Sequence, residues 1–193
     1  MSELSIINDG LVRLGVPPIA SLEESSAQAI GAGNIYPRVR ATALADFPWS
    51  FATQQTDLSR LTVPEGDRQW AGYEYVYQVP LDAARVLGLE SKDSYWISGW
   101  RLFTDAKDAR MVYVANVEES HWPAWFAQAV ALQFAAAAAI MLTDATTRAD
   151  LMYREAQSAM QRARSLDAQQ VPKKVLDLMG IYARRRSNFM AGA

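Results

Sequence analysis

Hydrophobic residues recur at helical spacing at the start of the chain. Residues 2–14 carry one apolar stripe, which consists of Leu4, Ile7, Leu11 and Leu14. This spacing predicts a helix with Ser2 as its N-cap and Gly15 as its end. Two prolines, Pro17 and Pro18, follow directly and prevent the helix from continuing.

A second helix is expected after this short connection. Ser21 and Glu24 are three residues apart, which is the spacing of a capping box, so they predict a helix that runs to about Asp46. Pro37 lies inside this helix and offers it no backbone N–H. We therefore expect a kink or an interruption near residues 34–37.

The pattern changes to that of short strands between residues 49 and 117. Three alternating tyrosines, Tyr73, Tyr75 and Tyr77, predict a strand that ends before Pro80. Further strands are expected at residues 85–89, 94–97, 101–104 and 111–114, with turns at Gly88, Gly99 and residues 105–108. Together they predict a small antiparallel sheet inserted between helices.

Helical character returns at Trp122. Residues 122–142 contain no charged residue, and a helix of this length is able to cross a membrane. However, the stretch is rich in alanine, contains Gln128 and Gln133, and has no basic residue directly after it. We therefore expect a fully buried central helix and no membrane partner.

The last long helix is predicted to start at Thr143 or Asp144 and to end near residues 167–170. Its apolar side consists of Met152, Ala156, Ala159, Met160, Ala163 and Leu166, and its other side carries Arg148, Arg154, Arg162 and Arg164. After Pro172, the final segment has one narrow apolar stripe, which consists of Val175, Leu178, Met179 and Tyr182.

These patterns predict an α+β fold, mainly an α-helical bundle with an inserted small antiparallel β-sheet and an extended C-terminal helical tail. The bundle is expected to comprise residues 1–48 and 118–170. The β-rich insertion comprises residues 49–117, and a basic docking tail comprises residues 171–193.

The distribution of charge separates the tail from the rest of the chain. The 193 residues have a formal net charge of −2. The tail contains five basic residues, Lys173, Lys174, Arg184, Arg185 and Arg186, against Asp177 alone. It is therefore basic, and the preceding part is correspondingly acidic, which indicates that the two parts meet different partners.

The residues that usually carry enzyme chemistry are nearly absent. The chain has no cysteine and one histidine, which excludes disulfide scaffolds, thiolate sites and multi-histidine metal sites. His121 follows residues 118–120, Glu-Glu-Ser, but adjacent loop residues point apart and predict no catalytic geometry. Residues 31–33, Gly-Ala-Gly, lack the third glycine and the preceding strand of a dinucleotide fingerprint. We expect a non-enzymatic protein with no catalytic residue, metal or cofactor.

Large aromatic side chains are concentrated in the middle of the chain, where all six tryptophans lie between Trp49 and Trp125. Such side chains usually form a core, but one face of a small sheet cannot bury so many of them. Tryptophan and tyrosine are also common anchors of protein interfaces. The predicted subunit or tail interface therefore consists of Trp70, Tyr73, Tyr95, Trp96 and Trp100.

The tail is the second candidate interaction site. A segment with one narrow apolar stripe and a basic face cannot bury that stripe alone, so it packs back on the bundle or docks onto a partner. The candidate docking residues are Lys173, Lys174, Val175, Leu178, Met179, Tyr182, Arg184, Arg185, Arg186 and Phe189.

Several stretches together resemble one family. Residues 7–25 contain an asparagine, a Leu-Gly-x-Pro-type turn and a Ser-Leu pair, here Asn8, Leu14, Gly15, Pro17 or Pro18, Ser21 and Leu22. Residues 36–58 contain a tyrosine, an arginine and a Pro-Trp-x-Phe-Ala element before an expected strand, here Tyr36, Arg40, Pro48, Trp49, Phe51 and Ala52. Residues 73–89 and 142–170 add a strand pair and a long helix. These stretches resemble the bacteriophage tail tubular protein A family, the head-to-tail connector adaptors of tailed phages.

The resemblance implies a structural virion protein. Such adaptors form a ring, commonly dodecameric, under the portal protein, where they extend the DNA channel and provide the tail attachment platform. The implied partners are the portal protein, further copies of this chain, a distal tail or nozzle protein, and passing genomic DNA bound without sequence specificity. The implied location is the head–tail neck of the virion, after assembly in the host bacterial cytoplasm.

Two other functions remain open from the sequence. The arginines at positions 184–186 suit a nucleic-acid-binding accessory protein that uses its basic C-terminal tail. A small hydrolase centred on His121 is the third candidate.

Overall fold

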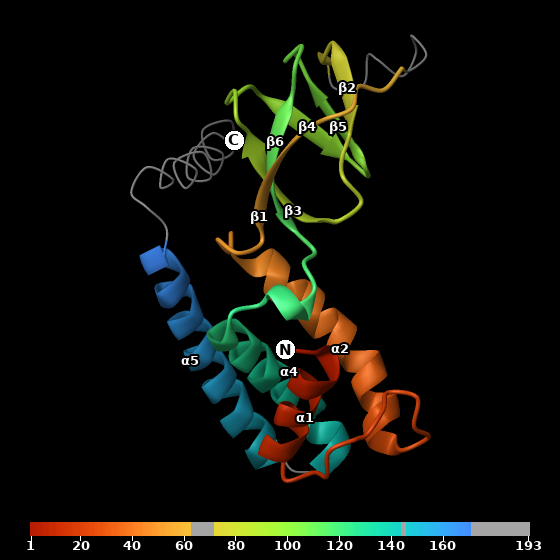
Figure 1. The fold of residues 1–193 in the computed structure, drawn as a ribbon, viewed down its shortest axis with the longest axis vertical. Helices are drawn as coiled ribbons and strands as arrows, with labels where there is room; N and C mark the ends of the chain where they lie inside the picture. Colours follow the sequence, from red (N-terminus) through yellow and green to blue (C-terminus); the bar gives the residue numbers. More distant parts are fainter. Residues whose placement is uncertain (63–71, 144–145, 171–193) are drawn as a thin grey trace. The chain divides into compact units, whose positions relative to one another are not determined.

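The structure is a computed structural model that describes residues 1–62, 72–143 and 146–170 (Figure 1). Within these residues it contains four α-helices, one short 3-10 helix and six β-strands. The helices and the strands belong to different parts of the chain, so the fold is mixed α+β. The predicted tail lies outside the described residues.

The chain divides into a helical unit and a β unit. The helical unit comprises Met1–Phe51 and Val117–Gln170, and the described part of the β unit comprises Ala52–Asn116. The helical unit is therefore built from two segments that are far apart in the sequence.

Helix α1, Glu3–Arg13, begins and ends at the predicted residues. The Oγ atom of Ser2 accepts a hydrogen bond from the backbone N–H of Ser5, and the Oγ atom of Ser5 accepts one from the N–H of Ser2. Gly15 has a φ of +72°, a conformation that glycine adopts without a steric penalty, and the helix stops before it.

The connection after α1 is held by Asn8. Its side-chain Nδ2 atom donates a hydrogen bond of 2.9 Å to the carbonyl oxygen of Ile19, and its Oδ1 atom accepts one of 2.9 Å from the N–H of the same residue. This pair of bonds fixes the proline-containing connection against the helix. Asn8 thus has a structural role at a position that contributes to the family resemblance.

Helix α2, Ala27–Asp46, starts later than the sequence predicts. Its N-cap is Ser26, whose Oγ atom accepts a hydrogen bond from Ala29 N–H. The predicted capping box is wrong, because the Glu24 carboxylate accepts hydrogen bonds from backbone N–H groups of Ala20 and Ser21 without starting a helix. Such side-chain bonds stabilise an isolated turn as well as a helix start.

Pro37 does not interrupt α2. The helix is continuous from Ala27 to Asp46, so the expected interruption is wrong. Proline removes a single backbone hydrogen bond, and the packing of α2 against α4 supplies stability that this local rule does not include.

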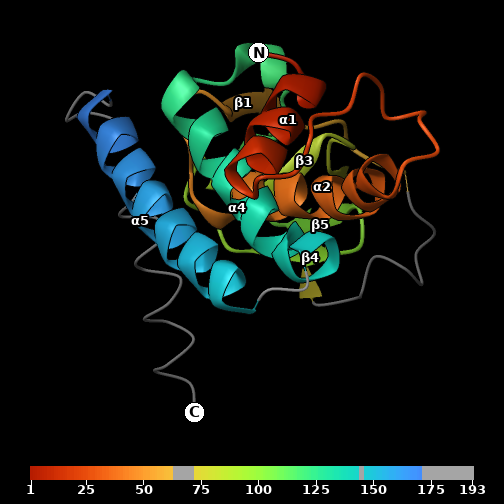
Figure 2. The same ribbon diagram turned by 90° about the horizontal axis from the view of Figure 1, so that it is seen from below.

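Helix α4, Ala124–Thr143, occupies the centre of the helical unit. It contacts α1, α2 and also α5, Thr146–Gln170, and Figure 2 shows it between α5 and the other two helices. Among the described residues, it is the one helix long and apolar enough to cross a membrane by length and composition. Most of it is buried as predicted, but its last turns expose Ile140 and Met141, so the expectation of full burial is wrong there.

Helices α1 and α4 approach each other closely at Gly10. A Cβ atom at this position would lie 2.7 Å from Cδ1 of Phe134 and 2.8 Å from the carbonyl oxygen of Ala131. No side chain fits this space, because one of the two contacts is with backbone. Tyr36 of α2 packs edge-to-face on the same Phe134 ring, with the centroids 6.1 Å apart.

Helix α5 buries a narrower stripe than the sequence predicts. Its buried residues are Met152, Ala156, Met160, Ala163 and Asp167. Ala159 and Leu166, which the periodicity assigned to the apolar side, are only half-buried. The buried side therefore includes a carboxylate in place of an apolar residue.

The β unit contains two three-stranded antiparallel sheets where the sequence predicts one. The first has the order β1-β6-β3, with strands Thr53–Asp57, Arg110–Ala115 and Ala83–Leu89. The second has the order β2-β5-β4, with strands Tyr75–Gln78, Arg101–Thr104 and Tyr95–Ser98. After β1, the chain continues to β2, where Leu61 N–H donates a hydrogen bond of 2.8 Å to the carbonyl oxygen of Val76.

Three details of these strands differ from simple periodicity. The polar strand β1 is not predicted by the hydrophobic pattern, because it is an edge strand that pairs with the buried strand β6. Gly88 lies within β3 at a shift of register, so the turn expected there is wrong and the glycine accommodates a β-bulge. Gly99 forms the β4–β5 turn as predicted, with a φ of +57°.

We predict opposite effects for two helical glycines. Gly10→Ala should lower the free energy of unfolding by about 1–3 kcal/mol, because its methyl group overlaps the backbone of α4. Gly33→Ala in α2 should raise it by about 0.5–1 kcal/mol, because a Cβ atom there meets no atom within 4 Å. Urea denaturation measures both, and equal effects of the two substitutions would contradict the close approach of α1 and α4.

Candidate interaction surface

The Pro-Trp-Ser-Phe-Ala element lies at the end of α2 and forms part of the core. Trp49 is fully buried, and its Nε1 atom donates a hydrogen bond of 2.8 Å to the carbonyl oxygen of Ala43. Its ring centroid lies 4.7 Å from that of Phe126 and 5.0 Å from that of Phe47. This residue therefore joins the end of α2 to the start of α4.

Trp49 belongs to a larger aromatic cluster in the helical unit. The rings of this cluster are Phe47, Trp49, Phe51, Trp122, Trp125 and Phe126. Half of the six tryptophans are thus in the helical unit. The sheets therefore do not have to bury these three, because their ring partners lie on α4 and in the segments next to it.

A buried carboxylate attaches α5 to the same element. Asp167 is 1% exposed, and its carboxylate accepts hydrogen bonds from the backbone N–H of Ser50 at 3.0 and 3.1 Å. The Oγ atom of Ser50 donates a further bond of 2.7 Å to it. The sequence analysis missed Asp167, although its position four residues after Ala163 on the apolar side is a signal for a partnered buried acid.

The residues around His121 do not form an acid–base site. The Glu119 carboxylate accepts hydrogen bonds from Arg40 Nε at 2.7 Å and from the Tyr36 hydroxyl at 3.1 Å, so it binds α2. Burial, followed by the negative charge of Glu119, raises the pKa of Tyr36 well above its usual value. His121 is exposed, with its Nδ1 atom 3.1 Å from the Oγ atom of Ser120. The geometry therefore assigns Tyr36, Arg40 and Glu119 to a structural cluster.

The described residues contain no arrangement of metal ligands. Within residues 1–62, 72–143 and 146–170, no three His, Asp or Glu side chains lie together in a way that could hold a metal ion.

Two of the five predicted interface aromatics are well exposed on the β unit. Trp96 is 51% and Trp100 is 50% exposed, and both lie on or beside the edge strand β4. Tyr95 is half-buried, and Tyr73 packs against the buried pair Val76 and Phe103. Trp70 lies outside the described residues. The structure thus leaves Trp96 and Trp100 as the exposed part of the predicted set.

An open hollow of about 400 Å³ in the β unit has Trp100 in its lining. It is lined by Val79, Ala83, Ala84, Arg85, Val86, Ile97, Gly99 and Trp100, which come from β3, β4 and the segments next to them. Leu81, in the connection before β3, is 79% exposed. We call Trp100 together with this hollow the aromatic surface.

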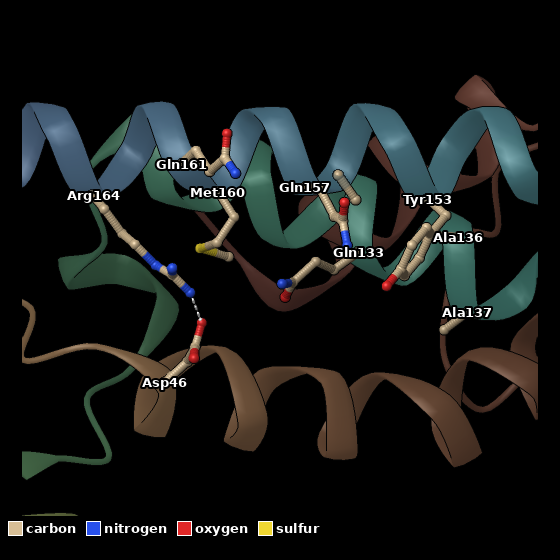
Figure 3. Close-up of a pocket in the computed structure, with 10 residues that line it drawn as sticks. Asp46, Gln133, Ala136, Ala137, Tyr153, Gln157, Met160, Gln161 and Arg164 are labelled. Atoms are coloured by element: carbon tan, nitrogen blue, oxygen red, sulfur yellow. Dashed lines mark hydrogen bonds and ion pairs between the residues drawn. The ribbon is translucent and has the colours of Figure 1, made fainter.

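The helical unit carries a second exposed apolar set. Its members at the α4–α5 end are Ile140, Met141, Leu151 and Tyr153, each more than half exposed. Tyr153 also lines a groove of about 530 Å³ between α4 and α5, which we call groove I (Figure 3). An ion pair between Arg164 of α5 and Asp46 of α2 crosses this groove.

A second groove of about 530 Å³ also lies along α4 and α5, and we call it groove II. It is lined by Arg13, Trp125, Gln128, Leu132, Glu155, Ser158, Ala159, Arg162, Ala163 and Leu166. The two grooves share no lining residue. Helix α5 therefore packs on α4 and leaves a groove along each flank.

All ten predicted docking residues of the tail, from Lys173 to Phe189, lie outside the described residues. Comparison of the sequence with protein-family models and with curated proteins finds no match.

We predict that the exposed tryptophans contribute little to folding. Trp96→Ser and Trp100→Ser should each lower the free energy of unfolding by about 1–2 kcal/mol, because half of each side chain is already in water. Trp49→Ser should lower it by about 3–5 kcal/mol, because that side chain is fully enclosed. Thermal and urea unfolding distinguish these values. A loss at Trp96 as large as at Trp49 would assign Trp96 to the core.

We also predict that Asp167 is essential to the helical unit. Asp167→Ala should lower the free energy of unfolding by about 2–3 kcal/mol, because the half-buried N–H and hydroxyl of Ser50 lose their acceptor. The control Glu155→Ala changes an exposed acid on the same helix and should alter stability by less than about 0.5 kcal/mol. Equal effects would show that the carboxylate position does not matter.

Proposed function

We propose that the protein is a head-to-tail adaptor, a structural virion protein that forms a ring under the portal of a tailed phage. In this proposal the four helices form the bundle of each subunit, and the β unit is the inserted platform. Residues 171–193 form the tail that docks onto the portal. The function requires no catalytic residue or cofactor.

The observation that carries the proposal is that the residues behind the resemblance stabilise the fold, while other large apolar residues remain exposed. Positions that contribute to the resemblance, such as Asn8, Arg40 and Trp49, hold the helical unit together. Folding also leaves large apolar residues exposed, among them Trp96 and Trp100 on the β unit and Tyr153 on the helical unit. A stable fold that leaves large apolar residues exposed supports an assembly role, because these residues are available for contacts with other subunits.

A ring also requires two different contact surfaces on each subunit. Head-to-tail contacts between identical subunits bury one surface of a subunit against another surface of its neighbour. The aromatic surface and the exposed set at the α4–α5 end are two chemically different candidates. Together they support a ring better than a two-fold symmetric dimer, which needs only one surface.

The charge of the chain suits a passage for DNA. Because the basic residues are concentrated after residue 170, the part that precedes the tail has a negative net charge. A ring of about twelve such subunits would repel the phosphate backbone and let DNA slide without binding it. The distal side of the ring would present the platform for a tail or nozzle protein.

The proposal predicts ring formation on the portal protein from the same genome. The full chain should co-sediment with the portal, and electron microscopy should show one added ring of about twelve subunits. A chain that ends at Gln170 should not bind, because it lacks the docking tail. Trp96→Ser with Trp100→Ser should reduce the number of bound subunits while the chain stays folded.

A different outcome would support the accessory function. If neither chain binds the portal and the full chain shifts DNA in a gel, the basic tail acts on nucleic acid instead. Steep salt dependence of that binding, lost when Arg184, Arg185 and Arg186 are replaced by alanine, would identify the contact. This result would overturn the adaptor proposal.

A further inference from the structure

Groove I lies between α5 and α2, with α4 behind it (Figure 3). Along α5 its lining begins at Tyr153 and ends at Arg164, which forms the ion pair with Asp46 of α2. A helix rises about 1.5 Å per residue, so the groove extends about 16 Å along α5. This length matches about five residues of an extended chain, which rises about 3.3 Å per residue.

Polar side chains from two helices converge on groove I. They are Gln133 of α4 and Tyr153, Gln157 and Gln161 of α5. In Figure 3, the side chains of Gln133, Tyr153 and Gln157 point into the space between α5 and α2. None of these four forms a hydrogen bond with residues 1–62, 72–143 or 146–170. Because each amide has two N–H donors and one carbonyl acceptor, the groove offers hydrogen bonds to a ligand.

The spacing of these groups on α5 matches that of an extended backbone. Tyr153, Gln157 and Gln161 follow one another at four-residue intervals, which are steps of about 6 Å on one side of a helix. In an extended chain, the N–H and C=O groups of every second residue point to the same side, at steps of about 6.6 Å. An amide can donate to the C=O and accept from the N–H of one such residue. Gln157 and Gln161 are therefore placed to bind two residues of one extended segment.

A helix is a poorer occupant of groove I. Its backbone N–H and C=O groups are bonded to each other along most of its length, so it offers the glutamines no main-chain partner. With side chains it is about 10–12 Å wide, whereas neighbouring extended chains lie only about 5 Å apart. The side chains of Arg164 and Asp46 meet across one end of the groove, so a helix that ran its whole length would break this ion pair. A short extended chain between Arg164 and Tyr153 leaves it intact.

The floor of groove I indicates which side chains the occupant carries. Ala136 and Ala137 of α4 and Met160 of α5 form this apolar part of the lining. Helix α4 contains no charged residue, so a charged side chain placed on it would lose its hydration without gaining a counter-ion. The small alanines leave room for larger apolar side chains. An extended chain presents such side chains to one face at every second position.

We propose that groove I binds an extended, uncharged segment of a partner protein. The amides of Gln157 and Gln161 hold its main chain, and its apolar side chains at alternate positions lie on Ala136 and Ala137. The site thus recognises the extended backbone and the alternation of side chains. This binding goes beyond the adaptor function and does not depend on it.

A synthetic peptide tests the site on the purified full chain. The probe is acetyl-Gly-Leu-Ser-Val-Ser-Leu-Gly-amide, which is uncharged and has an apolar residue at every second position. In proton–nitrogen NMR spectra it should shift the side-chain amide signals of Gln133 and Gln157. The signal of Gln169, an exposed glutamine of α5 that does not line groove I, should stay unchanged.

Two pairs of variants locate the contact. Gln157→Ala should weaken peptide binding about tenfold, because two hydrogen bonds to the main chain are lost, whereas Gln169→Ala should have no effect. Ala137→Glu should abolish binding, because it places a charge on the apolar floor. Its control is Ala124→Glu in the first turn of α4. Both alanines are exposed, and thermal unfolding verifies that each variant stays folded.

Two N-methylated peptides test whether the main chain is recognised. One carries N-methyl groups on its leucines and valine, and the other carries them on its serines. Each pattern removes N–H donors from one side of the extended chain only. One of the two peptides should therefore bind at least about tenfold more weakly than the other, because α5 bonds to a single side.

Three results would overturn the proposal. These are unchanged signals of Gln133 and Gln157, equal affinities of the two N-methylated peptides, and self-association of the free chain that Ala137→Glu abolishes, which would place a second copy in groove I. The peptide experiment contains no portal protein. Its failure therefore leaves the adaptor function standing, and failure of portal binding leaves the peptide site standing.

Discussion

The burial of Trp49 is the constraint on which the helical unit depends. Its ring packs on Phe126 of α4, its Nε1 atom is bound to α2, and the next residue, Ser50, is held by Asp167 of α5. Three helices therefore meet at one short segment, directly before the chain enters the β unit. Two of these bonds involve groups out of contact with water, so the loss of either partner leaves a buried polar group unsatisfied. The helical unit is closed at this point although its two segments are distant in sequence.

The packing of the helices explains why the helical unit has two open grooves beside α5. Gly10 lets α1 lie directly on the backbone of α4, and the alanines of α5 allow a similarly close contact on another side of α4. Small residues bring helix axes together but leave the flanks of a helix uncovered, since few long side chains bridge to the next helix. The two grooves beside α5 are a consequence of this packing. The partners proposed for assembly would use surface that the core itself does not need.

The tryptophans differ in burial, so residue type alone does not determine whether a side chain belongs to the core or to the surface. Trp49 and Trp122 are buried in an aromatic cluster, while Trp96 and Trp100 are half exposed on and beside an edge strand. All of them have the same intrinsic tendency to leave water. The difference is that a residue between helices finds partners on several sides, whereas an edge strand has a neighbour on one side only. That exposed pair is the structural basis for the interaction role proposed for the β unit.

The amino-acid sequence alone determined the elements whose signals are local. The helix from Ser2 to Gly15, the strand at Tyr75 and the turn at Gly99 follow from spacing, capping and backbone preference, which act over a few residues. Tertiary structure decided the continuity of α2 through Pro37, the pairing of the polar strand β1, and the burial of Asp167. Each of these depends on a partner distant in the chain, as Ser50 is for Asp167. The free energy that stabilises such a pair comes from shared exclusion of water, which no pattern within one segment contains.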